Sequence, residues 1–380
     1  MSAAPVQVPA ASGRILELDA LRGIAALGVV VWHYGAHFGA MPFHALLYPF
    51  YNAGFLFVDF FFVLSGYVIS RAYWREPRRL HFGRNVMSRI ARLYPLHLAT
   101  LLIVAGLLAA LPAGTPAPAF ELANNDAKHF LLNLLMLNQS GLQSGWSFNT
   151  PAWSISAEFI VNVLFLGFLA LGVRARAAAI AIAVVALAGL VATAGRPIVA
   201  GQFAFGILDV NLLRCFLGFG LGIAIYLLVH RWNFARVLAA RPALSSCFAF
   251  ASLASLAALL VASNRHPPIA HYLAAIAVSG ACVLFVPFSA LARTVLRHRG
   301  LVFLGDISYS TYLVHYPLQL ALLLASALGL PRLDYASPFV FLAFVLGVVA
   351  ISAATHRYVE LPSQRWLLER STRRDYAPLS

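Results

Sequence analysis

Charged residues are scarce in this chain. They make up 11% of its 380 residues, whereas hydrophobic residues make up 61%. A water-soluble domain usually carries about a quarter of its residues as charged ones, so the composition excludes an ordinary soluble globule. Apolar stretches long enough to cross about 30 Å of hydrocarbon recur along the sequence. We therefore predict an all-α integral membrane protein, built as a bundle of transmembrane helices.

Cysteine and acidic residues are also few. The three cysteines, Cys215, Cys247 and Cys282, lie in apolar stretches without paired or metal-ligand spacing. This pattern excludes a disulfide framework and predicts no metal site. Thirteen acidic residues oppose 27 basic ones, which gives a formal net charge of +14. Because the basic residues lie in short loops between apolar runs, this charge indicates membrane topology and not a nucleic-acid partner.

The distribution of arginine and lysine sets the predicted topology. If the N-terminus is cytoplasmic, 22 basic residues fall on the inner side, four fall on the outer side, and Arg214 lies inside a span. This asymmetry is the one that the positive-inside rule requires, and nine or eleven spans would move a basic cluster outside. We predict about ten spans in a single membrane domain over residues 1–380, with both termini cytoplasmic. The predicted spans are 17–38, 50–72, 93–111, 152–172, 177–194, 209–229, 243–262, 269–291, 301–328 and 338–357.

The remaining segments are short. We expect a cytoplasmic N-terminal segment over residues 1–16 and a basic cytoplasmic tail over 358–380. The longest outer segment, 112–151, contains an apolar piece at 129–137 that is too short to span and is expected to lie at the interface or dip back. Gly218 and Gly222 form a GxxxG pattern, which is typical of close helix packing.

One apolar stretch carries polar residues that a membrane span rarely contains. The run from Leu18 to Tyr34 includes Arg22 and His33, which share one helix face and lie about 16 Å apart along the axis. Polar groups at such depth are costly, so they indicate function. We predict that this face is the wall of a reaction channel.

Counting from the predicted span ends places polar residues of five different spans at one depth. A lone histidine in a membrane helix is often only a hydrogen-bonding partner of a neighbouring helix, and Arg214 is equally expected to be only a counter-ion for a carboxylate. Five such groups at one depth instead predict a shared site. They are His33, Asp59, Glu158, Arg214 and His315. Polar stripes at helical spacing accompany two of them, Ser154–Glu158–Asn162 and Ser308–Tyr312–His315–Gln319.

Several separated motifs resemble those of the acyltransferase 3 family of membrane acyltransferases. They are LDALRGIAALGVVVWHY at 18–34, VDFFFVLSGYVIS at 58–70, RIARLYPLHL at 89–98, PAWSISAEF at 151–159, LGDISYSTYLVHYPL at 304–318 and YVELP at 358–362. Because no soluble domain follows the last predicted span, the resemblance is to the form without a C-terminal hydrolase-like domain. It implies ten membrane helices in the bacterial inner membrane. It also implies transfer of an acyl group, usually acetyl from acetyl-CoA, to a hydroxyl of a surface polysaccharide, lipopolysaccharide, peptidoglycan, glycolipid or macrolide.

The resemblance also implies roles for particular residues. His33 matches the family's first-helix histidine, which is regarded as catalytic. Arg89 and Arg92 match its RxxR pair, which is associated with the donor at the cytoplasmic face. Residues 153–158 match its WSxxxE segment.

Acyl-CoA is cytosolic whereas surface glycans are modified outside, so the expected chemistry must bridge the membrane. We expect Arg22, Arg89 and Arg92 to bind the CoA phosphates, because a guanidinium pairs with phosphate bidentately. Ser65 is assigned to the same donor site. The pantetheine arm then presents the thioester to His33, which removes the proton of the acceptor hydroxyl.

The other assignments leave alternatives open. Either Glu158 or Asp59 is expected to orient the imidazole and stabilise its charged form. Residues assigned to the acceptor or the oxyanion are Trp153, Ser154, Arg214, Tyr312 and His315. Direct transfer and an acyl-enzyme on His33 both stay open, as do acetyl against succinyl or longer donors, the acceptor and the oligomeric state. The alternative function is an ion-coupled transporter or flippase, although the sequence shows no inverted repeat.

Overall fold

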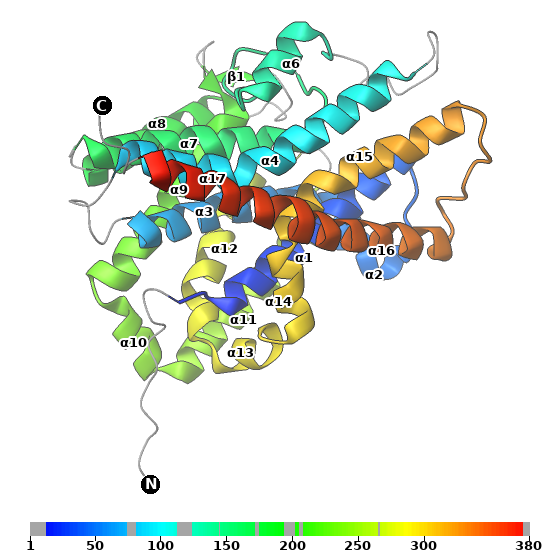
Figure 1. The fold of residues 1–380 in the computed structure, drawn as a ribbon. Coiled ribbons are helices and arrows are strands. Elements are labelled where there is room, and N and C mark those ends of the chain that lie inside the picture. The colour runs from blue at the N-terminus through cyan, green and yellow to red at the C-terminus, as the bar shows by residue number, and fades with distance from the viewer. Residues whose placement is uncertain are drawn as a thin grey trace, which may run out of the picture.

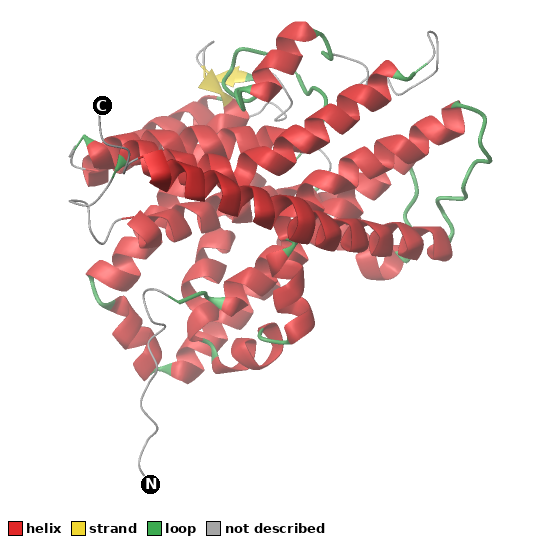
Figure 2. Cartoon of the chain, viewed as in Figure 1, coloured by secondary structure: helices red, strands yellow, loops and turns green. Residues whose placement is uncertain are grey.

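A computed structural model of the chain describes residues 13–73, 81–111, 124–143, 145–171, 175–193, 202–204, 208–264 and 267–374. The predicted N-terminal segment and the outer segment each lie partly outside these residues, as does the end of the tail. The described part is almost entirely helical, in agreement with the predicted fold class (Figure 2). Its one sheet pairs β1 (Phe203–Ala204) with β2 (Leu208–Asp209) in antiparallel register.

Figure 1 labels the α-helices of the described chain, and the short η elements lie between them. In chain order they are α1 (Leu16–Phe38), α2 (His44–Ala53), η1 (Gly54–Leu56), α3 (Phe57–Tyr73), α4 (Phe82–Ala109), α6 (Ala127–Leu134), η3 (Thr150–Ala152), α7 (Trp153–Ala170), α8 (Ala175–Ala192), α9 (Val210–Tyr226), η4 (Leu227–Arg231), α10 (Phe234–Ala240), α11 (Pro242–Ala262), α12 (Ile269–Phe285), η5 (Val286–Phe288), α13 (Ala290–Leu296), α14 (Arg299–Asp306), α15 (Ser308–Ala327), α16 (Pro338–Thr355), η6 (His356–Glu360) and α17 (Leu361–Arg374).

Seven helical segments of the described chain are long and apolar enough to cross a membrane. Of the other three predicted spans, α8 contributes a shorter apolar piece, and α1 and α15 carry polar side chains that lower their mean hydropathy. The total of ten spans and the location of the termini therefore stay predictions. The seven segments are His44–Tyr73, Phe82–Ala109, Thr150–Ala170, Val210–Arg231, Pro242–Ala262, Ile269–Phe288 and Pro338–Arg370.

At three places the helix ends differ from the predicted span ends. α4 begins at Phe82 and not at residue 93, so Arg89 and Arg92 lie on a helix and not in a basic loop. The helix extends beyond the predicted start of the span because no proline or glycine interrupts residues 84–94. The predicted ninth span is divided at Ile307 into α14 and α15.

The third boundary concerns the tail, which is helical as far as Arg374. Glu360, in the middle of the YVELP motif, is buried and accepts a hydrogen bond from Ser310 Oγ at 3.0 Å. Its carboxylate also lies 2.9 Å from His356 Nδ1. These contacts anchor the start of α17 to α15, and α17 then packs along α4, as Figure 1 shows.

The crossing of α3 and α9 has the closest backbone approach in the centre of the bundle. A Cβ added to Gly222 would lie 2.1 Å from the carbonyl oxygen of Val63, and one added to Gly66 would lie 2.1 Å from that of Phe219. No larger residue fits at either position. The predicted packing role of the GxxxG pattern is therefore confirmed.

The described outer segment forms α6, which packs against α4. Asp126 precedes the helix and accepts the backbone N–H of His129 at 2.9 Å, and this hydrogen bond lowers the pKa of the Asp126 carboxyl. With eight residues, α6 is too short to span a bilayer, in agreement with the sequence.

Candidate active site

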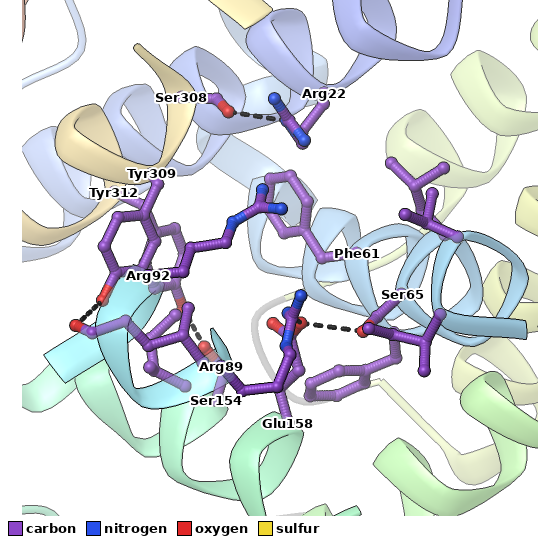
Figure 3. A pocket seen from close by; sticks show the side chains of 16 residues that line it. Arg22, Phe61, Ser65, Arg89, Arg92, Ser154, Glu158, Ser308, Tyr309 and Tyr312 are labelled. Carbon is purple, nitrogen blue, oxygen red and sulfur yellow. Dashed lines mark hydrogen bonds and ion pairs between the residues drawn. The ribbon is translucent and has the colours of Figure 1, made fainter. Parts of the chain in front are cut away.

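A cavity lies between α1, α3, α4, α7 and α15 (Figure 3). Its empty volume is about 760 Å³, which includes space open to solvent. The structure brings together here all four residues that the sequence assigns to the donor, Arg22, Ser65, Arg89 and Arg92. The other lining residues are Phe61, Phe62, Leu64, Val68, Ile69, Leu93, Ser154, Ile155, Glu158, Ser308, Tyr309 and Tyr312.

Two arginines of α4 bring more positive charge to the cavity than its one lining carboxylate, Glu158, balances. Arg89 is buried, and its Nη2 donates to Glu158 Oε1 at 3.4 Å, but its Nε has no hydrogen-bond partner. Arg92 makes no hydrogen bond or ion pair with any residue that the structure describes. Ser65 Oγ donates to the same Glu158 oxygen at 2.7 Å. Because buried donors are normally satisfied, the free N–H groups indicate a site for an anion.

Arg22 differs from these two arginines because the protein already uses most of its guanidinium. Its Nη2 donates to Gly305 O at 2.7 Å and its Nε to Ser308 Oγ at 2.8 Å. Asp19 lies 3.5 Å away. Arg22 therefore joins α1 to the junction of α14 and α15 while it lines the cavity.

Tyr312 and Phe61 form part of the cavity wall, and their rings meet edge to face with centroids 5.9 Å apart. The Tyr312 hydroxyl lies 2.7 Å from Ser154 Oγ. Because Ser154 donates to Pro151 O at 3.2 Å, the tyrosine is the donor between them. These hydroxyls are the polar groups at the end of an otherwise aromatic and aliphatic wall.

A pair of histidines lies beyond this wall. His315 follows Tyr312 by three residues on α15, and the two rings have centroids 6.0 Å apart. His315 Nε2 lies 3.2 Å from His33 Nδ1, and both rings are buried. His37, one turn further along α1, stacks on His33 with centroids 5.4 Å apart. Sequence reasoning missed His37, although its spacing of four from His33 was a visible signal.

The predicted channel along α1 needs correction. Arg22 lines the cavity but His33 does not. Between them, Ala26 and Val29 are at most 1% exposed, because neighbouring helices pack against that face. The cavity instead runs between α3, α4, α7 and α15 and ends about one helical turn short of His315.

Neither carboxylate that was expected to orient His33 is hydrogen-bonded to it. Asp59 is fully buried and receives Arg214 Nη2 at 2.9 Å and Nε at 3.3 Å. Glu158 is hydrogen-bonded to Ser65 and Arg89, as described above. The polar neighbour of the imidazole is His315. The sequence prediction matched these residues only by their depth in the membrane. Depth does not show toward which neighbouring helix each side chain points.

Arg214 is confirmed as the counter-ion of Asp59. Its Nη1 also donates to Asn211 Oδ1 at 2.8 Å, and its guanidinium lies over the Tyr272 ring, 4.1 Å from the centroid. Trp153 packs on the other side, 5.8 Å away. None of Asp59, Arg214 and Trp153 lines the cavity, so their geometry does not support the catalytic and oxyanion roles assigned from the sequence.

Comparison with known proteins identifies the group to which this arrangement belongs. The sequence profile of the family described as an acyltransferase domain (Acyl_transf_3) matches residues 15–357, nearly the whole chain. The chain belongs to the acyltransferase 3 family. Together with the apolar helices, this membership makes it a multi-pass membrane acyltransferase.

Two curated proteins show how this acyltransferase relates to others. It is 27% identical to "Acyltransferase MdmB" of Streptomyces mycarofaciens over 375 residues, which cover 93% of this chain and 92% of that protein. It is 31% identical to "Protein 2 in picA locus" of Rhizobium radiobacter over 163 residues, which cover 40% of this chain and 81% of that protein. No solved structure gave a significant match.

Proposed function

We propose that this acyltransferase moves an acyl group, acetyl in the first instance, from cytosolic acyl-CoA to a hydroxyl of a carbohydrate or glycoside at the outer side of the bacterial inner membrane. One observation carries the proposal. A single cavity is lined by Arg22, Arg89 and Arg92 and also by Tyr312, which lies about one helical turn before His315 of the buried histidine pair.

The donor end of the cavity suits the phosphates of CoA. Arg92 and the Nε of Arg89 offer N–H groups that have no partner among the described residues, and arginine binds phosphate oxygens with strong, charge-assisted hydrogen bonds. Figure 3 shows Arg22, Arg89 and Arg92 around the cavity, with Glu158 beside Arg89 and Tyr312 on the side opposite Ser65. The pantetheine arm carries amide N–H groups, which the Glu158 carboxylate accepts as the arm passes. The apolar walls then guide the arm toward Tyr312.

His33 supplies the base. Its Nδ1 lies 3.0 Å from the carbonyl oxygen of Val29, which can only accept, so Nδ1 carries the ring proton and Nε2 has the free lone pair. Nε2 removes the proton of the acceptor hydroxyl as its oxygen attacks the acyl carbon. When the C–S bond breaks, the same proton passes from Nε2 to the thiolate of CoA. When Tyr312 moves aside, its hydroxyl leaves Ser154 Oγ and donates its one proton to the transient oxyanion.

The acceptor approaches the histidine pair from the side away from the cavity. Gln319 follows His315 by one turn, on the face of α15 that also carries Tyr312. It is buried, and neither its Nε2 nor its Oε1 has a hydrogen-bond partner in the described chain. An acceptor rich in hydroxyls, such as a sugar, satisfies both atoms.

Donor and acceptor are separated by Tyr312 and Phe61, so transfer requires these side chains to move. Displacing them opens the last helical turn between the cavity and His33. While Tyr312 and Phe61 stay in place, the thioester in the cavity cannot reach His33. The base therefore cannot activate water for attack on the thioester before the side chains move.

Labelled acetyl-CoA added to inside-out membrane vesicles tests the function. Vesicles that contain the chain are expected to move label into alkali-labile esters of glycans or small glycosides, with the mass increase of one acetyl group per ester. Vesicles that carry His33→Gln at equal abundance are the control. Unchanged glycan and glycoside masses, with no CoA released from acetyl- or succinyl-CoA, would contradict the proposal.

A further inference from the structure

We propose that His315 is the positioning residue for His33. Its Nε2 accepts the N–H of His33 Nδ1, holds the imidazole with Nε2 free, and stabilises the imidazolium that forms during transfer. This inference rests on the proposed function, and it replaces the carboxylate that was expected from the sequence with a second imidazole.

The hydrogen-bond partners decide which nitrogen of each ring carries the proton. His315 Nδ1 lies 3.1 Å from Thr311 O, a carbonyl that can only accept, so this nitrogen is the donor. In the neutral ring Nε2 is then an acceptor, and it faces His33 Nδ1 at 3.2 Å. If the protons were instead on the Nε2 atoms, the lone pair of His315 Nδ1 would face Thr311 O and that of His33 Nδ1 would face Val29 O. Both contacts would then be repulsive. With both rings neutral, one proton pattern therefore serves every contact, and in it the single N–H of His33 Nδ1 is shared between Val29 O and His315 Nε2.

The surroundings of His33 explain why such a partner is needed. The imidazole is 7% exposed, and its ring neighbours are Trp32, His37 and His315. Neither Asp59 nor Glu158 is hydrogen-bonded to it. An imidazolium at this position therefore depends on the lone pair of His315 Nε2 to balance the added charge.

The reaction is balanced in protons without any further reactant. The acceptor's O–H proton moves to His33 Nε2, while the Nδ1 proton is shared with His315 Nε2. The new C–O bond forms, the C–S bond breaks, and the Nε2 proton leaves on the CoA thiol. The pair then returns to its starting tautomers.

A packing role for His315 would give a different response to substitution. His315→Leu keeps comparable volume but removes the acceptor, whereas His315→Gln can place an amide oxygen near the former Nε2. We expect kcat for label transfer from acetyl-CoA in membrane vesicles to fall about 10- to 150-fold in His315→Leu, with KM for acetyl-CoA unchanged. His315→Gln is expected to recover most of the loss.

His97→Gln is the matched control, because His97 is also buried and its Nε2 bonds a backbone carbonyl, that of Asn133 at 2.8 Å. Transfer by this variant is expected to stay near that of the unaltered protein. If His315→Leu transfers label at the rate of the unaltered protein, the proposal is overturned. It is also overturned if kcat falls equally in His315→Leu and His315→Gln.

Nitrogen-15 NMR of histidine-labelled protein in bilayers gives a second, independent measurement. His33 and His315 are both expected to be protonated at Nδ1 and unprotonated at Nε2, with assignments from His33→Gln and His315→Gln. A protonated Nε2 on neutral His315 overturns the inference. If the unaltered protein transfers no label at all, the proposed function fails, and this measurement still decides whether the hydrogen bond exists.

Discussion

Replacing Arg92 by glutamine should weaken CoA binding without harming the fold. Arg92 is partly exposed on α4 and has no hydrogen-bond or ion-pair partner among the described residues, so its removal leaves no buried group unpaired. The Arg92→Gln protein loses only the contact between this guanidinium and the CoA phosphates. A hydrogen bond to a charged group contributes about 1.5–3 kcal/mol, so the dissociation constant for CoA should rise about 10- to 150-fold.

Arg89→Gln should weaken CoA binding at least as much, and it should also lower stability. The reason is that Glu158, whose side chain is 19% exposed, then keeps only Ser65 as a hydrogen-bond partner. Arg92→Gln thus tests an arginine that contacts only the ligand, whereas Arg89→Gln tests one that also pairs with Glu158. Both effects should shrink in high salt, because added ions screen the phosphate charges.

Calorimetric titration of CoA into protein reconstituted in nanodiscs measures these effects, with thermal stability recorded on the same samples. Arg299→Gln is the matched control, since Arg299 is an exposed arginine at the start of α14, outside the cavity. It should leave the CoA affinity unchanged. A well-folded Arg92→Gln protein that binds CoA within twofold of the unaltered protein would refute the placement of the phosphates at this end.

Two further predictions concern Asp59 and Gln319. Asp59→Asn should lower the melting temperature of the solubilised protein, because an unpaired buried Arg214 costs about 3–5 kcal/mol, and unchanged melting would show that the pair contributes nothing. Gln319→Met should reduce transfer to the endogenous acceptor in membrane vesicles while CoA affinity in nanodiscs stays constant. Equal transfer rates in Gln319→Met and the unaltered protein would remove Gln319 from the acceptor side.

Much of the fold follows from the sequence because long apolar runs must form helices in a bilayer. The donor residues were also predictable. Arg89 and Arg92 belong to a recognisable motif, and their spacing of three places them on one side of α4. Helix ends were less predictable, because charged residues mark where a chain leaves the membrane and not where its helix begins. α4 illustrates this, since its first eleven residues precede the predicted span.

The grouping of the deep polar residues was not predictable in the same way. Counting residues gives a depth for Asp59, Glu158 and His315, but side-chain contacts also depend on the rotation and tilt of each helix. Asp59 faces α9, Glu158 faces the cavity, and only His315 meets His33. The barrier formed by Phe61 and Tyr312 likewise arises from three-dimensional packing and has no sequence signature.

The most direct test of the account is acyl transfer by His33→Gln in membrane vesicles, measured together with CoA affinity in nanodiscs. Loss of a general base lowers turnover by about 10²- to 10⁴-fold, and CoA affinity should stay unchanged because His33 does not line the cavity. The account predicts this separation of chemistry from donor binding. A correctly inserted His33→Gln protein that transfers label at the normal rate would contradict it.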